Sequence, residues 1–266
     1  MIMKSQQSKG FVIIASKKPA FYYSAINLIE SIMDEYPDAQ FALFTEKRFL
    51  DHRAEDPNIT VYDCKNHVRS KLYGMANSPF DLTMYIDADQ ECQHEDIITI
   101  WDQIGDDDMK FVELTKDKRA QGSFVEVTAP IPSTGDVIDL TLCGGVCLYN
   151  MKNPLVKDFM QDWWDMFVIQ ENYYQWSKGR GNKPKEDRWF PEDTPSSMLR
   201  WDQFTLWWLV NKVPKYNKLK IGIFAENYRW NWFTSFRQDE NGKHNLVNKH
   251  PILIHHSATM NKEFRA

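Results

Sequence analysis

The sequence lacks any long hydrophobic run. None of its 266 residues belongs to a stretch of about 18 consecutive apolar residues, the length that a membrane-spanning helix requires. The opening residues, MIMKSQQSKG, are polar and have no apolar segment of the kind that forms the middle of a secretory signal peptide. We therefore expect no transmembrane segment and a cytoplasmic location.

Cysteine is also scarce. The chain has four cysteines, and their spacing fits no zinc motif. Cys143 and Cys147 are expected on one strand, where residues four apart are too distant to form a disulfide. We therefore predict that Cys64, Cys92, Cys143 and Cys147 are free thiols in a reducing compartment.

The chain has no excess of basic residues. Its formal net charge is −5, whereas proteins that bind nucleic-acid backbones usually present a basic surface. Nucleic acid is therefore not an expected partner, although a local basic pocket for one small anion remains compatible with this charge. Hydrophobic residues make up 42% and charged residues 26%, which is typical of a globular protein with a sizeable core.

Aromatic residues are the one group in clear excess, at 14% of the chain with 10 tryptophans. Two interpretations stay open. Tryptophans line many sugar-binding clefts, because an aromatic face packs against the apolar C–H face of a pyranose. Tryptophan side chains also fill hydrophobic cores, where they bury a large apolar area.

The first half of the chain alternates between short apolar runs and segments with helical spacing. This alternation predicts an α/β fold with a mostly parallel central sheet flanked by helices. Ligands of such sheets bind beyond the carboxyl ends of the strands, where Ser16, Asp63, Asp87 and Asp89 are expected. The predicted strands are 11–16, 41–45, 58–63 and 83–87, and the predicted helices are 21–36, 67–77 and 96–104.

The second half continues the pattern without an internal repeat or an evident linker. We therefore predict a single domain over 1–266. Its predicted elements are strands 111–115, 140–150, 221–225 and 251–257, helices 155–174 and 196–212, and a charged loop at 177–195. Gly144 and Gly145 interrupt a strand, which indicates either the close approach of another group or a bulge.

In the segment TMYIDADQE, two carboxylates, Asp87 and Asp89, directly follow an apolar strand. Alternate residues of a strand point the same way, so two oxygen ligands could converge on Mg²⁺ or Mn²⁺. A cation held there could neutralise a departing diphosphate. The simpler interpretation, a strand that ends in an acidic turn, carries about equal weight from these residues alone.

Two chemistries use such a pair of aspartates. In phosphohydrolases of the haloacid-dehalogenase type, the first aspartate is a nucleophile near the start of the chain. Here 86 residues precede Asp87. In nucleotide-sugar glycosyltransferases the pair holds a metal in mid-domain, after three strands of a nucleotide-binding sheet. The order of elements favours the second chemistry.

Several motifs, in their order along the chain, resemble GT-A fold glycosyltransferases of family 8, the glycogenin and bacterial galactosyltransferase group. They are FVIIASKKPAFYYSAINLIESI, VRSKLYGMANSPF, TMYIDADQE, LCGGVCLYN, RWDQFTLWWL and WNWF. The resemblance implies that Asp202 and Gln203 act on the donor sugar. It implies that the nucleotide-sugar contacts Ala15, Ser16, Tyr22, Lys71, Asp87, Ala88, Gly144 and Gly145.

The last motif of this family has the form His-x-x-Gly-x-x-Lys, and HSATMNK follows its spacing from His256 to Lys262. The resemblance implies that His256 is the third metal ligand, beside Asp87 and Asp89, and that Lys262 contacts the diphosphate. Because a strand alternates its faces, only one of the adjacent histidines can point into the site, and the spacing to Lys262 favours His256. Three places depart from the family pattern: Cys143 replaces an asparagine, Thr259 replaces the glycine, and Glu263-Phe264 replaces the usual Pro-Trp after the lysine. The resemblance also implies a nucleotide-binding half at about 10–110 and a half for the donor sugar and the acceptor at about 111–266.

The predicted function is a metal-dependent glycosyltransferase that uses Mn²⁺ or Mg²⁺. It would transfer a sugar from a UDP-linked donor to a glycan or another hydroxyl acceptor, with retention of configuration by family analogy. Two alternatives stay open: a phosphohydrolase with Asp87 as its covalent residue, and a carbohydrate-binding protein without catalytic activity.

Overall fold

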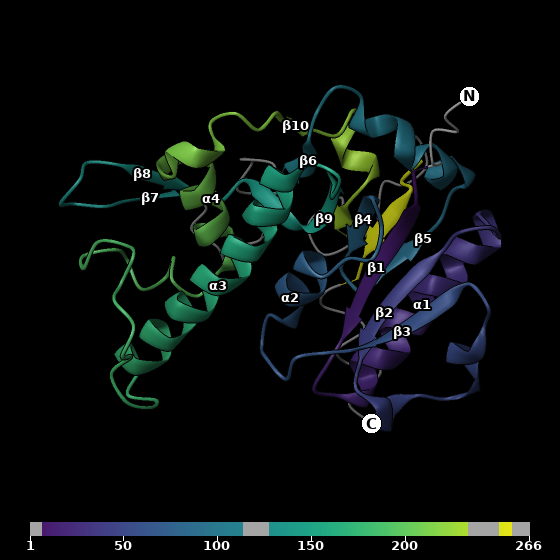
Figure 1. The fold of residues 1–266 in the computed structure, drawn as a ribbon, viewed down its shortest axis with the longest axis horizontal. Helices are drawn as coiled ribbons and strands as arrows, with labels where there is room; N and C mark the ends of the chain where they lie inside the picture. Colours follow the sequence, from purple (N-terminus) through teal and green to yellow (C-terminus); the bar gives the residue numbers. More distant parts are fainter. Residues whose placement is uncertain (1–6, 114–127, 234–249, 257–266) are drawn as a thin grey trace, which may run out of the picture.

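The structure is a computed structural model that describes residues 7–113, 128–233 and 250–256. A seven-stranded sheet with the order β10-β6-β9-β4-β1-β2-β3 forms its centre (Figure 1). β9 is antiparallel to β4 and β6, and the other neighbours in this sheet are parallel. The predicted α/β fold with a mostly parallel sheet is thus confirmed. The strands are β1 (Lys9–Ala15), β2 (Phe41–Thr45), β3 (Ile59–Asp63), β4 (Leu82–Ile86), β6 (Met109–Glu113), β9 (Leu142–Asn150) and β10 (Ile221–Ile223).

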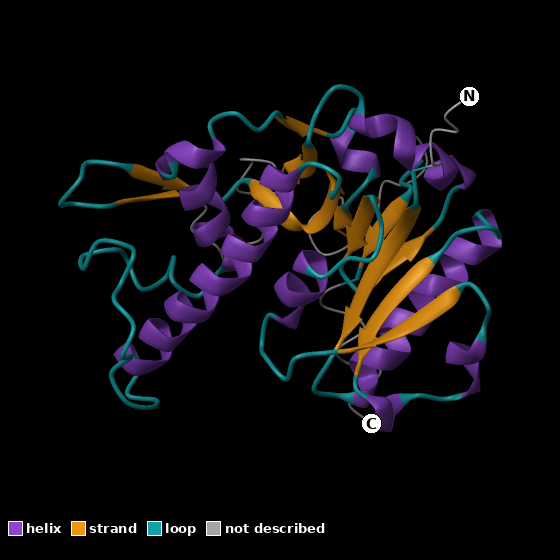
Figure 2. Cartoon of the chain, in the orientation of Figure 1, coloured by secondary structure: helices purple, strands orange, loops and turns teal. Residues whose placement is uncertain are grey.

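Helices cover both faces of the sheet (Figure 2). Along β1, Phe11 and Ile13 point into a core on the side of α1, while Val12 and Ile14 point into a second core with α2 and α3. A central parallel strand is buried on both faces, which is why this segment is apolar throughout rather than alternating. The helices are α1 (Pro19–Glu35), α2 (Ser70–Ala76), α3 (Pro154–Ser177) and α4 (Asp202–Lys212).

Short 3₁₀ helices fill several connections. The helix expected at 96–104 belongs to this class, because η3 spans Glu95–Ile104. The others are η1 (Lys47–Phe49), η2 (His52–Glu55), η4 (Pro214–Tyr216) and η5 (Asn227–Arg229).

A second, three-stranded sheet joins distant parts of the chain. It contains β5 (Gln90–Cys92), β11 (Trp232–Phe233) and β12 (Leu253–His255), with β12 (yellow in Figure 1) antiparallel to β5. The sequence pattern did not predict β5. Its pairing with β12 is important for the site, because it lays the last described segment beside the residues that follow Asp89.

The part of the molecule at the left of Figure 1 contains α3, α4 and the hairpin of β7 (Thr128–Pro130) and β8 (Val137–Asp139). A third, aromatic-rich core lies here. The structure confirms the sheet and its flanking helices, whereas the division into a nucleotide half and an acceptor half stays a prediction.

The helix expected at 196–212 begins only at Asp202. Two backbone carbonyl oxygens just before it accept hydrogen bonds from a side chain of α3. The Gln170 side-chain amide of α3 donates to the carbonyl oxygens of Leu199 and Trp201, at 3.0 and 2.8 Å. Trp201 itself has extended backbone angles, φ −109° and ψ 134°. This anchor fixes Asp202 at the first turn of α4, which determines where its carboxylate lies.

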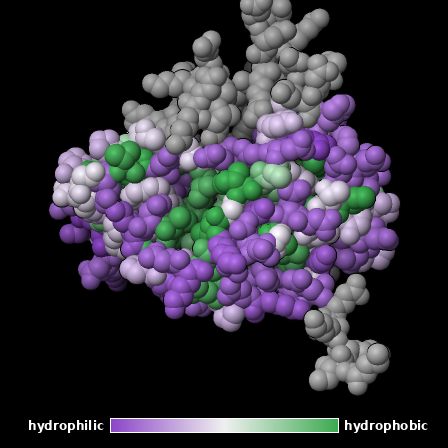
Figure 3. Space-filling model, turned by 90° about the horizontal axis from the view of Figure 1, so that it is seen from above, coloured by the Kyte–Doolittle hydropathy of each residue, from purple (hydrophilic) through white to green (hydrophobic). Residues whose placement is uncertain are grey.

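Most of the surface seen in Figure 3 is hydrophilic, with hydrophobic residues gathered in a central band. Half of the tryptophans are buried in the cores, which supports core packing for Trp101, Trp163, Trp207, Trp230 and Trp232. All four cysteines are free, as predicted. Among the described residues, no helix combines the length and the apolar character needed to cross a membrane.

The core on the α1 side gives a stability prediction. Phe11 is fully buried, and its ring lies 5.4 Å from that of Phe41 and 5.2 Å from that of Trp101. Phe11→Ala should lower the free energy of unfolding by about 3–5 kcal/mol, because a cavity replaces these contacts. Phe21→Ala, at a ring that is 42% exposed, should change it by no more than about 0.5 kcal/mol. Urea denaturation measures both, and equal effects would contradict this core.

Candidate active site

The candidate site lies where the order of the sheet reverses. From β1 the chain proceeds outward to β2 and β3, and then returns to place β4 on the other side of β1. Ser16 follows the carboxyl end of β1, and Asp87 follows that of β4. A reversal of this kind leaves a crevice outside the carboxyl ends of the two strands, which is where ligands of α/β sheets bind.

Three potential metal ligands converge at this point. One donor atom from each of Asp87, Asp89 and His255 lies within 4.8 Å of the other two. The imidazole Nε2 of His255 is 3.1 Å from Asp89 Oδ1, and His255 is only 7% exposed. Two carboxylates with one imidazole form a donor set suited to Mn²⁺ and, with a more oxygen-rich shell completed by water or substrate, to Mg²⁺. These residues therefore fit the divalent ion that the sequence predicts.

The two aspartates converge because of a turn rather than strand alternation. β4 ends at Ile86, and the Gln90 backbone N–H donates to the Asp87 carbonyl oxygen at 3.2 Å, which closes a tight turn around Ala88 and Asp89. The Asp87 backbone N–H donates to the Gly145 carbonyl oxygen at 2.8 Å and fixes the start of the turn. The sequence left two interpretations open, an acidic turn and a pair of converging carboxylates. In the structure both hold, because the turn itself brings the two carboxylates together.

His255, and not His256, reaches these carboxylates, which corrects the prediction of His256 as the third ligand. Adjacent residues at the end of a strand point to opposite faces. The ring of His256 points to the other side, where Nε2 lies 2.9 Å from Glu91 Oε2. Its backbone N–H donates to the carbonyl oxygen of Asp89 at 2.9 Å and extends the pairing of β12 with the preceding turn.

Lys71 joins this acidic turn to the start of α4. Its Nζ lies 3.3 Å from Asp87 Oδ1 and 3.3 Å from Asp202 Oδ2, and it donates to the Gly144 carbonyl oxygen at 3.2 Å. Burial opposes the charge on Lys71, but the two carboxylates outweigh that effect and raise the pKa of the amine. The structure therefore brings together Lys71, Asp87 and Asp202, all of which the sequence analysis selected.

Asp202 is 1% exposed and has a second basic partner, Arg69, which the sequence analysis missed. Arg69 Nε lies 3.2 Å from Asp202 Oδ1, so each oxygen of this carboxylate faces one cation. Burial alone would raise the pKa of Asp202, but Lys71 and Arg69 outweigh it and hold that pKa below its usual value. The only signal for Arg69 was its position two residues before Lys71.

Tyr85 is another residue that sequence reasoning missed. Its hydroxyl donates to Asp87 Oδ1 from within β4. Burial, followed by the charge of Asp87, raises the pKa of Tyr85 well above its ordinary value, so the phenol stays protonated and remains a donor. Asp87 Oδ1 is therefore held by Tyr85 and Lys71, while Oδ2 points toward Gly145.

The glycine pair of β9 makes room for the carboxylates. Opposite β9, Phe111 pairs with Cys147 but Val112 pairs with Cys143, so the segment around Gly144 and Gly145 bulges out of register. A Cβ on Gly145 would lie 2.6 Å from Asp87 Oδ2, and one on Gly144 would lie 3.3 Å from Asp202 Oδ2. Both interpretations offered for this pair, a bulge and a close approach, therefore hold.

The remaining predicted residues lie at varied distances from this cluster. Ser16 Oγ shares a 2.7 Å hydrogen bond with Ser70 Oγ, beside the buried end of β1 at Ala15. Tyr22 is 0% exposed and its hydroxyl donates to Asp51 Oδ1 at 2.8 Å, while its contact with a nucleotide stays a prediction. Lys262 lies outside the described residues.

Gln203, the neighbour of Asp202, has a buried Oε1 atom with no hydrogen-bond partner in the part of the chain that the structure describes. Buried acceptors in proteins are nearly always satisfied. A partner supplied by a ligand would meet this requirement.

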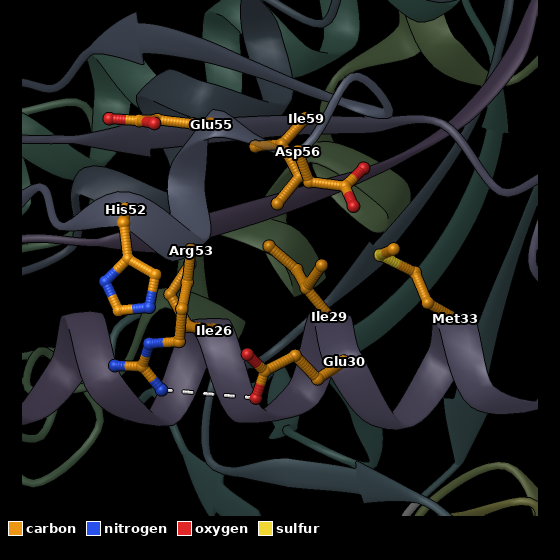
Figure 4. Close-up of a pocket in the computed structure, with 9 residues that line it drawn as sticks. All are labelled: Ile26, Ile29, Glu30, Met33, His52, Arg53, Glu55, Asp56 and Ile59. Atoms are coloured by element: carbon orange, nitrogen blue, oxygen red, sulfur yellow. Dashed lines mark ion pairs between the residues drawn. The ribbon is translucent and has the colours of Figure 1, made fainter.

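A separate pocket of about 340 Å³ lies between α1 and the η2 segment (Figure 4). Ile26, Ile29 and Met33 of α1 contribute apolar side chains to it. An ion pair of 4.0 Å between Arg53 Nη1 and Glu30 Oε2 joins its two walls. None of the residues of the acidic cluster lines this pocket, so it is distinct from the candidate active site.

Comparison with known proteins gives a likeness in structure only. No family model matches the chain, and no curated protein matches it in sequence. The bifunctional glycosyltransferase WbbM aligns with a TM-score of 0.50 and 14% identity over 97% of this chain and 47% of its own. The glycosyltransferase GlyE of Streptococcus pneumoniae TIGR4 aligns with a TM-score of 0.53 and 12% identity over 93% and 54%.

The galactosyltransferase LgtC, in complex with donor and acceptor sugar analogs, aligns with a TM-score of 0.48 and 13% identity over 94% of this chain and 87% of its own. The chain spans about half the length of WbbM and GlyE. At such low identity, WbbM and GlyE support one conclusion: the protein has a fold found in glycosyltransferases.

The charges around Asp202 predict an acid-dependent loss of stability. Asp202→Asn leaves Arg69 and Lys71 short of a carboxylate, which should lower the free energy of unfolding by about 3 kcal/mol at pH 7. A carboxyl whose pKa is depressed by folding stabilises the protein above its unfolded pKa, about 3.9, and loses that contribution as the pH falls through the lower folded pKa. The difference between wild type and variant should therefore be constant from pH 7 to 5 and shrink below pH 4.

Urea denaturation from pH 3 to pH 7 measures this difference. Asp38→Asn, at an exposed position far from Lys71, serves as the control and should leave stability almost unchanged. A constant difference between wild type and Asp202→Asn over the whole range would contradict the ionised Asp202.

Proposed function

We propose that the protein is a metal-dependent glycosyltransferase that transfers a sugar from a nucleotide-sugar donor, UDP-linked by family analogy, to a hydroxyl acceptor. The observation that carries this proposal is the convergence of Asp87, Asp89 and His255 at the reversal point of the sheet. The first two belong to one turn and the third comes from β12, far along the chain. A fold shared with WbbM and GlyE supports the same conclusion.

In this proposal Asp87, Asp89 and His255 hold Mn²⁺ or Mg²⁺. A divalent ion there would supply the positive charge that stabilises a nucleoside diphosphate as it departs. Lys71 adds a second, fixed positive charge next to Asp87. Its three contacts, to Asp87, Asp202 and the Gly144 carbonyl oxygen, keep the ammonium in place without a ligand, so little ordering is needed when the phosphates bind.

Asp202 and Gln203 would bind the donor sugar. Asp202 is held rigidly by Arg69 and Lys71 at the first turn of α4, and Gln203 presents a buried acceptor that a sugar hydroxyl would satisfy. Ser16, at the end of β1, and the backbone around Ala88, Gly144 and Gly145 complete the proposed donor site. Lys262 is assigned to the diphosphate by the resemblance alone.

The proposed reaction retains the configuration at the anomeric carbon. The bond from this carbon to the diphosphate oxygen breaks while a bond to the acceptor oxygen forms on the same face. The acceptor proton moves to the departing phosphate oxygen. No side chain is required as a nucleophile. This agrees with Asp87, whose Oδ1 accepts hydrogen bonds from Tyr85 and Lys71.

A thermal-shift panel tests this function. Binding of a ligand to the folded state raises the melting temperature by mass action. UDP and UDP-sugars should stabilise the wild type with Mn²⁺ present and much less without it, while Asp89→Asn should lose the metal-dependent increase and retain its fold by circular dichroism. The same variant should lose metal-dependent sugar transfer.

A phosphate-release assay and the same thermal-shift panel with added glycans distinguish the competing functions. A phosphohydrolase would release phosphate from simple monoesters and lose that activity with Asp87→Asn. A carbohydrate-binding protein would respond to glycans and to no nucleotide. Either result would replace the glycosyltransferase assignment.

The two histidines provide a sharper comparison. His255→Ala should abolish the Mn²⁺-dependent thermal shift, because it removes the only imidazole within reach of Asp89 among the described residues. His256→Ala should keep this shift and lose the contact with Glu91. Calorimetric titration with Mn²⁺ measures both affinities. If only His256→Ala lost affinity for Mn²⁺, the third ligand would be His256, as the family's spacing implies, and the assignment of His255 would be wrong.

A further inference from the structure

A buried asparagine contacts the imidazole of His255 at Nδ1, the ring nitrogen that does not face Asp89. Asn231 is 2% exposed and lies directly before β11, which runs parallel to β12. Its side-chain Oδ1 is 3.1 Å from Nδ1 of His255. Its Nδ2 donates to the sulfur of Cys143 at 3.4 Å. One amide thus links the histidine to the start of β9.

The orientation of this amide determines which ring nitrogen of His255 carries the proton. Because Nδ2 is engaged with the sulfur of Cys143, it is the acceptor Oδ1 that faces the ring. The Nδ1 atom must then be the donor, which leaves Nε2 as the ring nitrogen that is available to a cation. Nε2 is the atom that lies 3.1 Å from Asp89 Oδ1, in the middle of the acidic cluster.

We propose that Asn231, held in place by Cys143, is a positioning residue that engages Nδ1–H of His255, so that Nε2 becomes the metal-binding nitrogen when a divalent cation replaces its contact with Asp89 Oδ1. This inference rests on the metal site of the proposed function. Outer partners of metal-binding histidines commonly act in this way, by setting the tautomer and the ring orientation. The role explains why a cysteine at position 143 is compatible with the site: its sulfur accepts a hydrogen bond from Asn231 and orients the amide.

The affinity for Mn²⁺ alone, measured by isothermal titration calorimetry, tests the role of Asn231. Asn231→Leu keeps the approximate volume and removes the acceptor, so affinity should fall roughly 10- to 100-fold. Asn231→Asp keeps an oxygen acceptor for Nδ1–H and should retain the wild-type affinity.

Asn227→Ala is the matched structural control. Asn227 also bridges two groups, the backbone N–H and carbonyl of Glu113, at 2.8 and 2.7 Å. Its loss should lower the melting temperature and leave Mn²⁺ affinity unchanged.

The outcomes separate this inference from the proposed function. Equal affinity of the wild type and Asn231→Leu would overturn the positioning role and leave the metal site intact. Equal losses in Asn231→Leu and Asn231→Asp would show a merely structural residue and overturn it as well. Failure of the wild type to bind Mn²⁺ would overturn both proposals.

A second measurement needs no variant. In ¹⁵N-histidine-labelled wild type saturated with diamagnetic Mg²⁺, the ring nitrogen shifts of His255 should report a proton on Nδ1 and none on Nε2. A proton on Nε2 would overturn the inference.

Discussion

The ammonium of Lys71 lies between two carboxylates that the fold brings close together, and the rest of the site depends on this contact. Asp87 belongs to the turn after β4, and Asp202 belongs to the first turn of α4. Asp202 is buried, and Lys71 and Arg69 hold its pKa below the usual value against the opposing effect of burial. Lys71 therefore ties α2, β4 and α4 into one unit. Arg69 pairs with Oδ1 of Asp202, so Lys71 is shared between Asp202 Oδ2 and Asp87 Oδ1.

The bulge of β9 makes room for these charged side chains. A residue with a side chain at position 145 would collide with Asp87, so the paired carboxylates and the glycine pair require each other. The same bulge exposes the Gly144 and Gly145 carbonyl oxygens to Lys71, to the Asp87 amide and to the side chain of Gln90. A rigid backbone wall thus supports the acidic turn, as the proposed cation site requires.

The sequence predicted this fold well because its signals are local. Apolar runs bounded by glycine, proline and polar residues identified the strands, and the alternation with helices implied a parallel sheet whose carboxyl ends carry the site. Asp87, Asp89, Lys71 and Asp202 were found in this way or by resemblance. The sequence selected His256 rather than His255, the histidine that faces Asp89, because strand alternation offers two faces and only the partner strand decides between them. That partner, β5, is three residues long and has no distinctive pattern.

By itself the sequence identified the strands of the central sheet and its main helices, and the strand that ends in paired carboxylates, since both follow from neighbours along the chain. Only the tertiary structure decided that His255 rather than His256 faces Asp89, that Arg69 and Tyr85 hold the carboxylates, and that Asn231 stands behind the imidazole. These contacts join residues from different strands, helices and turns, and most of the pairs are far apart along the chain. Their geometry depends on register, turns and packing, which no local pattern of amino acids specifies.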